Sequence, residues 1–233
     1  MSQIPMNHYT CNVYAIHGNL IRMYIFSLTV AVFLFLAYHF IAFEQRPVLL
    51  RWFLWGIVFC IPGLLLRSWF MFLYPNFWGS VFLIYSFGMA FFIVPIALSM
   101  GGIALTLRIQ HKTIPETHEI EAFQLGWAAL YLCAHSIVYW GKLYWVYALA
   151  IPLLYLCTVH ITIPLIELCF RESFPETLRP LFAILGIALG AGLITSLPFF
   201  GFGIVTVILT AVAVVGSVFL WVKWHPALVS RSL

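Results

Sequence analysis

Long apolar segments constrain this chain more than any other feature of its sequence. A helix that crosses a bilayer needs about 20 largely apolar residues, and irregular backbone cannot face lipid because its polar groups would lack hydrogen-bond partners. Seven segments meet this requirement: 23–43, 49–74, 78–107, 122–140, 144–170, 181–197 and 202–222. The sequence therefore predicts an all-α polytopic membrane protein, a bundle of seven transmembrane helices.

Composition excludes the soluble alternatives. Hydrophobic residues make up 64% of the 233 residues and charged residues only 8%, whereas a soluble domain carries about a quarter charged residues. A water-soluble protein of this size could not cover so many apolar side chains. We therefore expect no soluble enzyme, no nucleic-acid partner and no soluble domain beside the membrane part, and the lipid bilayer is the main expected partner.

Lysine and arginine predict the orientation, because cytoplasmic loops of membrane proteins are enriched in them. One side of the predicted bundle collects Arg46, Arg51, Arg108, Lys112, Arg171, Arg179, Lys223 and Arg231, whereas the other side has Arg22, Arg67 and Lys142. We therefore expect the N-terminus outside and the C-terminus in the cytoplasm, with the bacterial inner membrane as the default compartment. Tryptophans near the span ends, Trp52 and Trp55 among them, are expected to form an aromatic belt.

The chain divides into one membrane domain and two tails. Residues 1–20 lack the basic start, apolar middle and cleavage site of a signal peptide, so they are predicted to form a polar extracytoplasmic tail. Residues 21–224 form the seven-helix transmembrane domain, and residues 225–233 form a cytoplasmic tail.

Polar residues inside the predicted spans are the candidates for function, because ionisable groups are costly in a membrane. Residues three or four apart share one face of a helix. Such a stripe on the fourth span contains Tyr131, His135, Tyr139 and Lys142, and one on the fifth contains Cys157, His160, Pro164, Glu167 and Arg171. Two interpretations stay open: the stripes line an interrupted polar path for a small solute, or each histidine bonds a neighbouring helix and stabilises the bundle.

Carboxylates are sparse, and we expect none at the centre of the bilayer, which argues against a proton pump or a carboxylate-driven ion carrier. Glu167 and Arg171 are four residues apart, which predicts an ion pair near the cytoplasmic end of the fifth span. A group of ionisable side chains lies in the predicted loop before the fourth span and consists of His111, Glu116, His118, Glu119 and Glu121. We expect this group to be solvated, and the alternative is that it binds a divalent cation. No metal site is predicted.

Two loops share a short pattern, residues 113–117 and 173–177, in which a hydroxyl precedes a glutamate by three positions. This spacing is typical of a capping box at a helix start. It is open to two interpretations, an internal duplication of helical hairpins or independent use of a good helix start.

The sixth span carries a packing signal. Gly186 and Gly190 form a small-xxx-small pattern, which lets another helix approach closely. The expected neighbour is the last span, a different membrane protein or a second copy of this chain.

Three classes of function remain open. The first is a permease-like or transport-linked protein for a small neutral or amphipathic solute, and the second is a non-catalytic anchoring subunit of a larger membrane complex. The third is a membrane-embedded enzyme that handles lipid or haem, supported only by scattered histidines such as His39 and His160. Metalloprotease, hydrolase and phosphate-loop signatures are missing, so no catalytic residue and no cofactor are assigned, with haem as the alternative.

Overall fold

The computed structural model describes residues 46–73, 81–138, 150–173 and 175–229. These form six long helices and one short 3-10 helix: α2 (Arg46–Leu73), α3 (Val81–Ile109), α4 (Thr117–Val138), α5 (Ile151–Arg171), α6 (Leu178–Ser196), η3 (Leu197–Phe200) and α7 (Gly203–Val229). Each long helix overlaps a predicted span, with ends displaced by up to seven residues. The all-helical prediction is confirmed for the described residues. The first predicted span, 23–43, lies outside them, so the count of seven and the orientation stay predictions.

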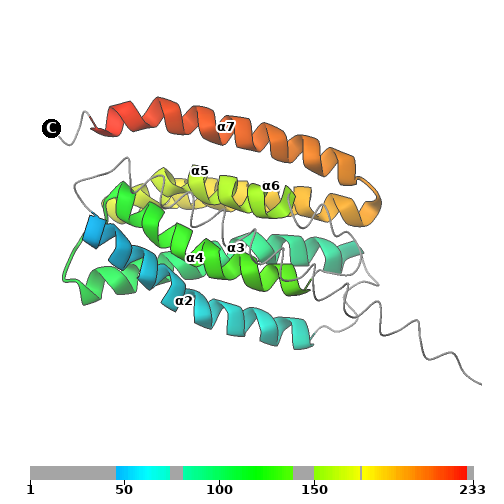
Figure 1. The fold of residues 1–233 in the computed structure, drawn as a ribbon, viewed down its shortest axis with the longest axis horizontal. Coiled ribbons are helices and arrows are strands. Elements are labelled where there is room, and N and C mark those ends of the chain that lie inside the picture. The colour runs from blue at the N-terminus through cyan, green and yellow to red at the C-terminus, as the bar shows by residue number, and fades with distance from the viewer. Residues whose placement is uncertain (1–45, 74–80, 139–149, 174, 230–233) are drawn as a thin grey trace, which may run out of the picture.

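The helices lie side by side along the long axis of the molecule (Figure 1). α7 lies along one edge of the bundle and α2 along the opposite edge in this view, with the other helices between them. The closest associations join α2 to α4, α3 to α6, and α5 to both α6 and α7. Successive helices are antiparallel, so α3, α5 and α7 end where α2, α4 and α6 begin.

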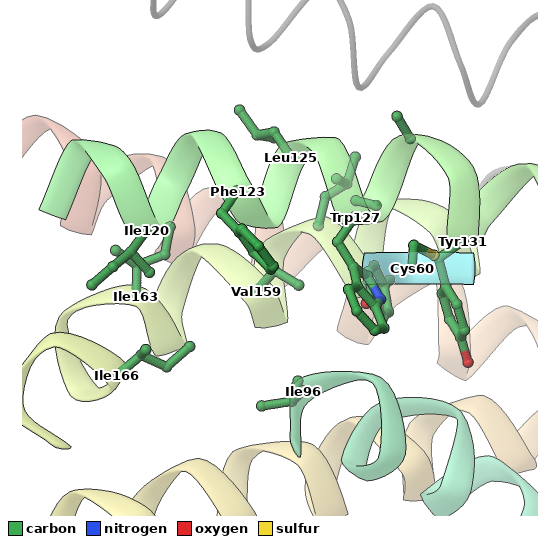
Figure 2. Close-up of a cluster of buried hydrophobic side chains, with 14 of the residues drawn as sticks. Cys60, Ile96, Ile120, Phe123, Leu125, Trp127, Tyr131, Val159, Ile163 and Ile166 are labelled. Atoms are coloured by element: carbon green, nitrogen blue, oxygen red, sulfur yellow. The ribbon is translucent and has the colours of Figure 1, made fainter. Parts of the chain in front are cut away.

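α4 is the interior helix of the bundle. Every residue from Glu119 to Leu132 is buried except Glu121 and Leu130, which are half-buried. A helix that is covered on all faces belongs to the core of a bundle. In Figure 2, Ile120 and Phe123 of α4 extend toward Val159 and Ile163 of α5.

Two glycines allow α2 and α4 to approach to backbone contact. A Cβ atom at Gly126 would lie 2.0 Å from the carbonyl oxygen of Phe53, and one at Gly56 would lie 2.1 Å from the carbonyl oxygen of Phe123. Neither distance leaves room for any side chain. Small residues at a helix crossing are characteristic of membrane bundles, where close packing replaces the hydrophobic driving force.

Trp52 belongs to this core, so its expected place in an aromatic belt is wrong. Its side chain is fully buried and meets the ring of Phe123 edge-on, with centroids 6.3 Å apart. Trp55 is half-buried and stacks on Phe59. The physical reason is that α2 turns Trp52 toward α4 rather than toward lipid.

A proline in α3 is compensated by a tyrosine from α4. Pro95 lies inside α3 and has no N–H, so the carbonyl of Phe91, four residues earlier, loses its helical donor. The hydroxyl of Tyr131 donates to that carbonyl oxygen at 3.1 Å. The ring of Tyr131 also stacks on Tyr155, with centroids 5.3 Å apart. The hydroxyl therefore completes the hydrogen bonding of an interrupted helix.

The turn between α3 and α4 places Lys112 over the start of α4. His111 has a positive φ of 54°, and the N–H groups of His111 and Lys112 donate to the carbonyls of Arg108 and Leu107. This pair of bonds is the Schellman motif that ends many helices. Glu119 then accepts a hydrogen bond from the backbone N–H of Glu116 at 2.9 Å.

The predicted capping boxes are therefore wrong in position. The residue before α4 is Glu116 rather than Thr113, and the capping carboxylate is Glu119. α6 begins after Thr177, which makes no side-chain cap; its hydroxyl donates back to the carbonyl of Glu172 at 3.1 Å. Since the two helices start differently, the shared pattern gives no support for a duplication.

α7 presents an apolar outer face. Its side chains that are more than half exposed are Ile204, Ile208, Val212, Val215, Val218 and Phe219. Its inner face carries the buried hydroxyl residues Thr206, Thr210 and Ser217. An apolar surface of this extent is unsuited to water and matches lipid.

Candidate functional site

A carboxylate and an imidazole meet between α4 and α5. Nδ1 of His160 lies 3.7 Å from Oε1 of Glu121, and their side chains are 27% and 13% exposed. His160 lies near the middle of the apolar segment Pro152–Arg171. Ionisable groups at such a position are costly and mark functional candidates. Glu121 was expected in a solvated loop, and that expectation is wrong because α4 begins four residues before it. The expected absence of a carboxylate near the middle of the spans is also wrong, since Glu121 lies beside His160, and it no longer argues against a carboxylate-driven carrier.

A second polar contact lies between the same two helices. The hydroxyl of Thr117 donates to a carboxylate oxygen of Glu167, and the other carboxylate oxygen of Glu167 pairs with Arg171. The predicted ion pair between Glu167 and Arg171 is thus confirmed. Arg171 is 55% exposed and Glu167 only 12%. We call Thr117, Glu121, His160, Glu167 and Arg171 the α4–α5 seam, which runs from an exposed end into the bundle.

Pro164 adds a further polar group to the seam. It lies inside α5 and cannot donate to the carbonyl of His160, four residues earlier. The turn at His160 therefore offers a ring nitrogen beside Glu121 and a backbone carbonyl without its usual helical donor. That carbonyl and the carboxylate of Glu121 can accept hydrogen bonds from a small polar ligand.

Glu119, the other glutamate of the first turns of α4, has a different role. It is buried, with 2% of its side chain exposed, and pairs with Lys112 at 2.8 Å. Burial disfavours the charged ammonium of Lys112, but the hydrogen bonds and negative charges of Glu119 and Glu116 outweigh it and raise the pKa of Lys112. This pair fixes the α3–α4 turn, so the loop group is not simply solvated.

Among the described residues, no three His, Cys, Asp or Glu side chains converge closely enough to hold a metal ion. The haem alternative rests on His39, which lies outside the described residues. Haem therefore stays untested, and no residue is assigned to a cofactor.

The other described residues that were predicted to line a polar path make contacts outside the α4–α5 seam. Tyr131 is buried, with its hydroxyl bound to Phe91. Cys157 is buried, and its side chain is hydrogen-bonded to the side chain of Ser217 on α7. Lys142 lies outside the described residues, and so does the side chain of His135. The structure thus brings His160 and Glu167 to one seam, while the roles of Tyr131, His135, Lys142 and Cys157 on a path stay predictions.

No described residue covers the small-residue pattern of α6 at its two glycines. A Cβ atom at Gly186 or Gly190 would have no heavy atom within 4 Å among the described residues. In the described part of the chain, the predicted close approach of another helix is not seen at Gly186 and Gly190, whose role stays a prediction. A close approach that the sequence analysis did not predict occurs at Gly56 and Gly126.

The sequence analysis placed Glu121 in a loop and did not identify it as a functional candidate. Its spacing could have done so, because it belongs to a series with a helical period of three or four residues: Thr117, Glu121, Gln124 and Ala128. Gln124 is buried and donates to Ser99 of α3 at 2.8 Å. These polar residues show that α4 extends further toward its N-terminus than hydropathy suggests.

The fold and the polar seam together show which class of protein this is. Five described helices are long and apolar enough to cross a membrane: α2, α3, α5, α6 and α7. α4 is more polar in its first two turns and lies inside them. The chain is an integral membrane protein in contact with the lipid bilayer, with a polar seam inside its helical bundle. No protein-family model, curated protein or solved structure matches it.

Proposed function

We propose that the protein is a permease or transport-linked protein for a small neutral or amphipathic solute, which moves along the α4–α5 seam. The observation that carries this proposal is the contact between Glu121 and His160, inside the bundle and near the middle of an apolar helix. A purely structural bundle gains little from such a pair, because desolvating two ionisable groups costs more than most contacts between them return.

The break at Pro164 also supports the proposal. Transporters commonly bind solutes near the bilayer midplane, at interrupted helices whose freed backbone groups contact the solute. A neutral solute with hydroxyl or amide groups would donate to Glu121 and to the carbonyl of His160. We propose the bacterial inner membrane as the location, with the exposed Arg171 end of the seam facing the cytoplasm.

Osmotic swelling of vesicles tests this function. The purified protein is reconstituted in lipid vesicles, and light scattering follows the entry of glycerol, urea and glucose. We expect faster entry of at least one of these solutes than in protein-free vesicles. Glu121→Gln and His160→Gln should slow that entry severalfold at unchanged melting temperature. The exposed Glu176→Gln is the matched control and should leave it unchanged. Absence of faster entry for all three solutes contradicts the proposal.

A second candidate is a non-catalytic anchoring subunit of a larger membrane complex, or a subunit of a homo-oligomer. The open surface at Gly186 and Gly190 favours it, since small residues allow a partner helix to approach closely. Purification in mild detergent separates the two candidates. A partner that co-purifies in a fixed ratio, and is lost in Gly190→Leu, supports the subunit.

A further inference from the structure

The charge around Glu121 distinguishes it from Glu119, the buried glutamate of the same helix. Glu119 is paired with Lys112. Among the described side chains, His160 is the one basic group within ion-pair distance of Glu121. Because a neutral imidazole does not balance a carboxylate, the charge of Glu121 depends on whether the pair holds a proton.

The surrounding elements supply few other charges. The described titratable side chains on the helices packed around the pair are Arg51 and Cys60 on α2, Arg108 on α3, His118, Glu119 and Tyr131 on α4, Tyr155, Cys157, Glu167, Cys169 and Arg171 on α5, and Arg179 on α6. Residues 203–220 of α7 contribute none. Arg51, Arg108 and Arg179 are exposed, and Arg171 is bound to Glu167. Among the described residues, no arginine therefore neutralises the pair from inside the bundle.

We propose that Glu121 and His160 together bind one proton, which is the coupling ion of the transport that we propose for the same seam; this inference rests on that function. Without the proton, the site is a carboxylate beside a neutral imidazole, with a net charge of −1. Uptake of one proton from the aqueous phase converts the carboxylate of Glu121 to a carboxyl group beside the imidazole of His160, and the net charge becomes zero.

The change in net charge is what couples proton binding to the state of the seam. An unbalanced charge inside an apolar bundle costs several kcal/mol, so the unprotonated site favours a hydrated, open seam. The neutral site favours a dry, closed one. Proton uptake therefore shifts the population toward the closed seam, and a solute that binds the closed seam is bound together with the proton.

Infrared titration of the protein in lipid vesicles tests the site without any solute. As the pH falls, but still above the range in which exposed glutamates are protonated, the carbonyl stretch of a protonated carboxyl should appear in wild type and be absent in Glu121→Gln. Glu176→Gln, which changes an exposed glutamate, should keep the band. His160→Gln leaves the carboxyl in place and should shift the midpoint of the titration by about one pH unit or more, a tenfold change in proton affinity. A band that persists in Glu121→Gln, or a midpoint unaffected by His160→Gln, overturns the proposal.

Swelling measurements separate this proposal from the proposed function. If the infrared band depends on both residues but no solute enters faster, the proton site stands and the permease function fails. If a solute enters faster, and the rate is the same with and without a pH gradient, the permease function stands and the coupling fails.

Discussion

At the scale of single residues, the hydroxyl of Tyr131 replaces a backbone donor that Pro95 removes from α3. Tyr131→Phe keeps the aromatic packing but removes the hydrogen bond of this hydroxyl to the buried carbonyl of Phe91. We expect a loss of about 1–3 kcal/mol in the free energy of unfolding. Pro95→Ala restores an N–H to α3. In that background Tyr131→Phe should cost less, with a coupling of about 0.5 kcal/mol or more.

Unfolding by denaturant of the wild type, the two single variants and the double variant measures this coupling. Strictly additive losses would show that Tyr131 stabilises the bundle through its ring alone. This hydrogen bond could be predicted from the sequence only in part. A proline inside a helix leaves the carbonyl four residues earlier without its helical donor, so Pro95 identifies the carbonyl of Phe91. No local pattern shows that a side chain forty residues later supplies the donor.

Lys112 provides a pH-dependent prediction at the same scale. Its pKa is raised above 10.5 in the folded protein, because Glu119 and Glu116 outweigh partial burial. The ammonium therefore stabilises the fold fully below pH 10.5, and this contribution is lost as the pH rises through the raised pKa. Lys112→Arg keeps its charge in that range. Melting temperatures between pH 9 and pH 12 should fall more steeply in wild type than in Lys112→Arg, and equal slopes would contradict the assigned role of Lys112.

At the scale of elements, the contact between α2 and α4 depends on two glycines. Gly126→Ala would place a Cβ atom 2.0 Å from the carbonyl oxygen of Phe53. Backbone cannot move aside as a side chain can, so we expect a loss of about 1–3 kcal/mol or more in the free energy of unfolding. The matched control is Gly190→Ala, which has no atom within 4 Å among the described residues. It should be neutral or stabilise by up to about 1 kcal/mol, as alanine favours helix.

Equal losses in the two variants of the isolated protein would mean that α6 is packed as closely as α2 and α4. Ala122 lies four residues before Gly126, the same small-xxx-small spacing as in Gly186 and Gly190. The pattern therefore exists in both α4 and α6, and sequence spacing cannot tell which of the two faces meets another helix.

Hydropathy predicted the six described helices because an apolar run of sufficient length must be helical in lipid. It did not predict that α4 lies inside the bundle, because length and composition do not specify neighbours. The polar residues of α4 were the available clue: Glu119, Glu121 and Gln124 need partners from other helices, and an interior helix has the most of them. The pairing of Glu121 with His160 required the antiparallel register of α4 and α5, which no local pattern fixes.

At the scale of the whole molecule, the predicted orientation determines which compartment the α4–α5 seam opens to. The ends of α3 and α5 and the starts of α4 and α6 lie at one end of the bundle, where Thr117 bonds Glu167. This end carries Arg108, Lys112, Arg171 and Arg179, which favours the cytoplasm. The exposed end of the seam at Arg171 is then cytoplasmic.

Thiol labelling in intact cells tests this orientation. In a variant whose other cysteines are replaced, a membrane-impermeant maleimide should label Cys11, which we predict to be outside. In a Ser232→Cys variant without Cys11, labelling should require permeabilised cells. Labelling of both positions from one side would require an even number of crossings and exclude the bundle of seven. Labelling of residue 232 alone from outside would reverse the orientation, so that the seam would open away from the cytoplasm and take up its proton from the external medium.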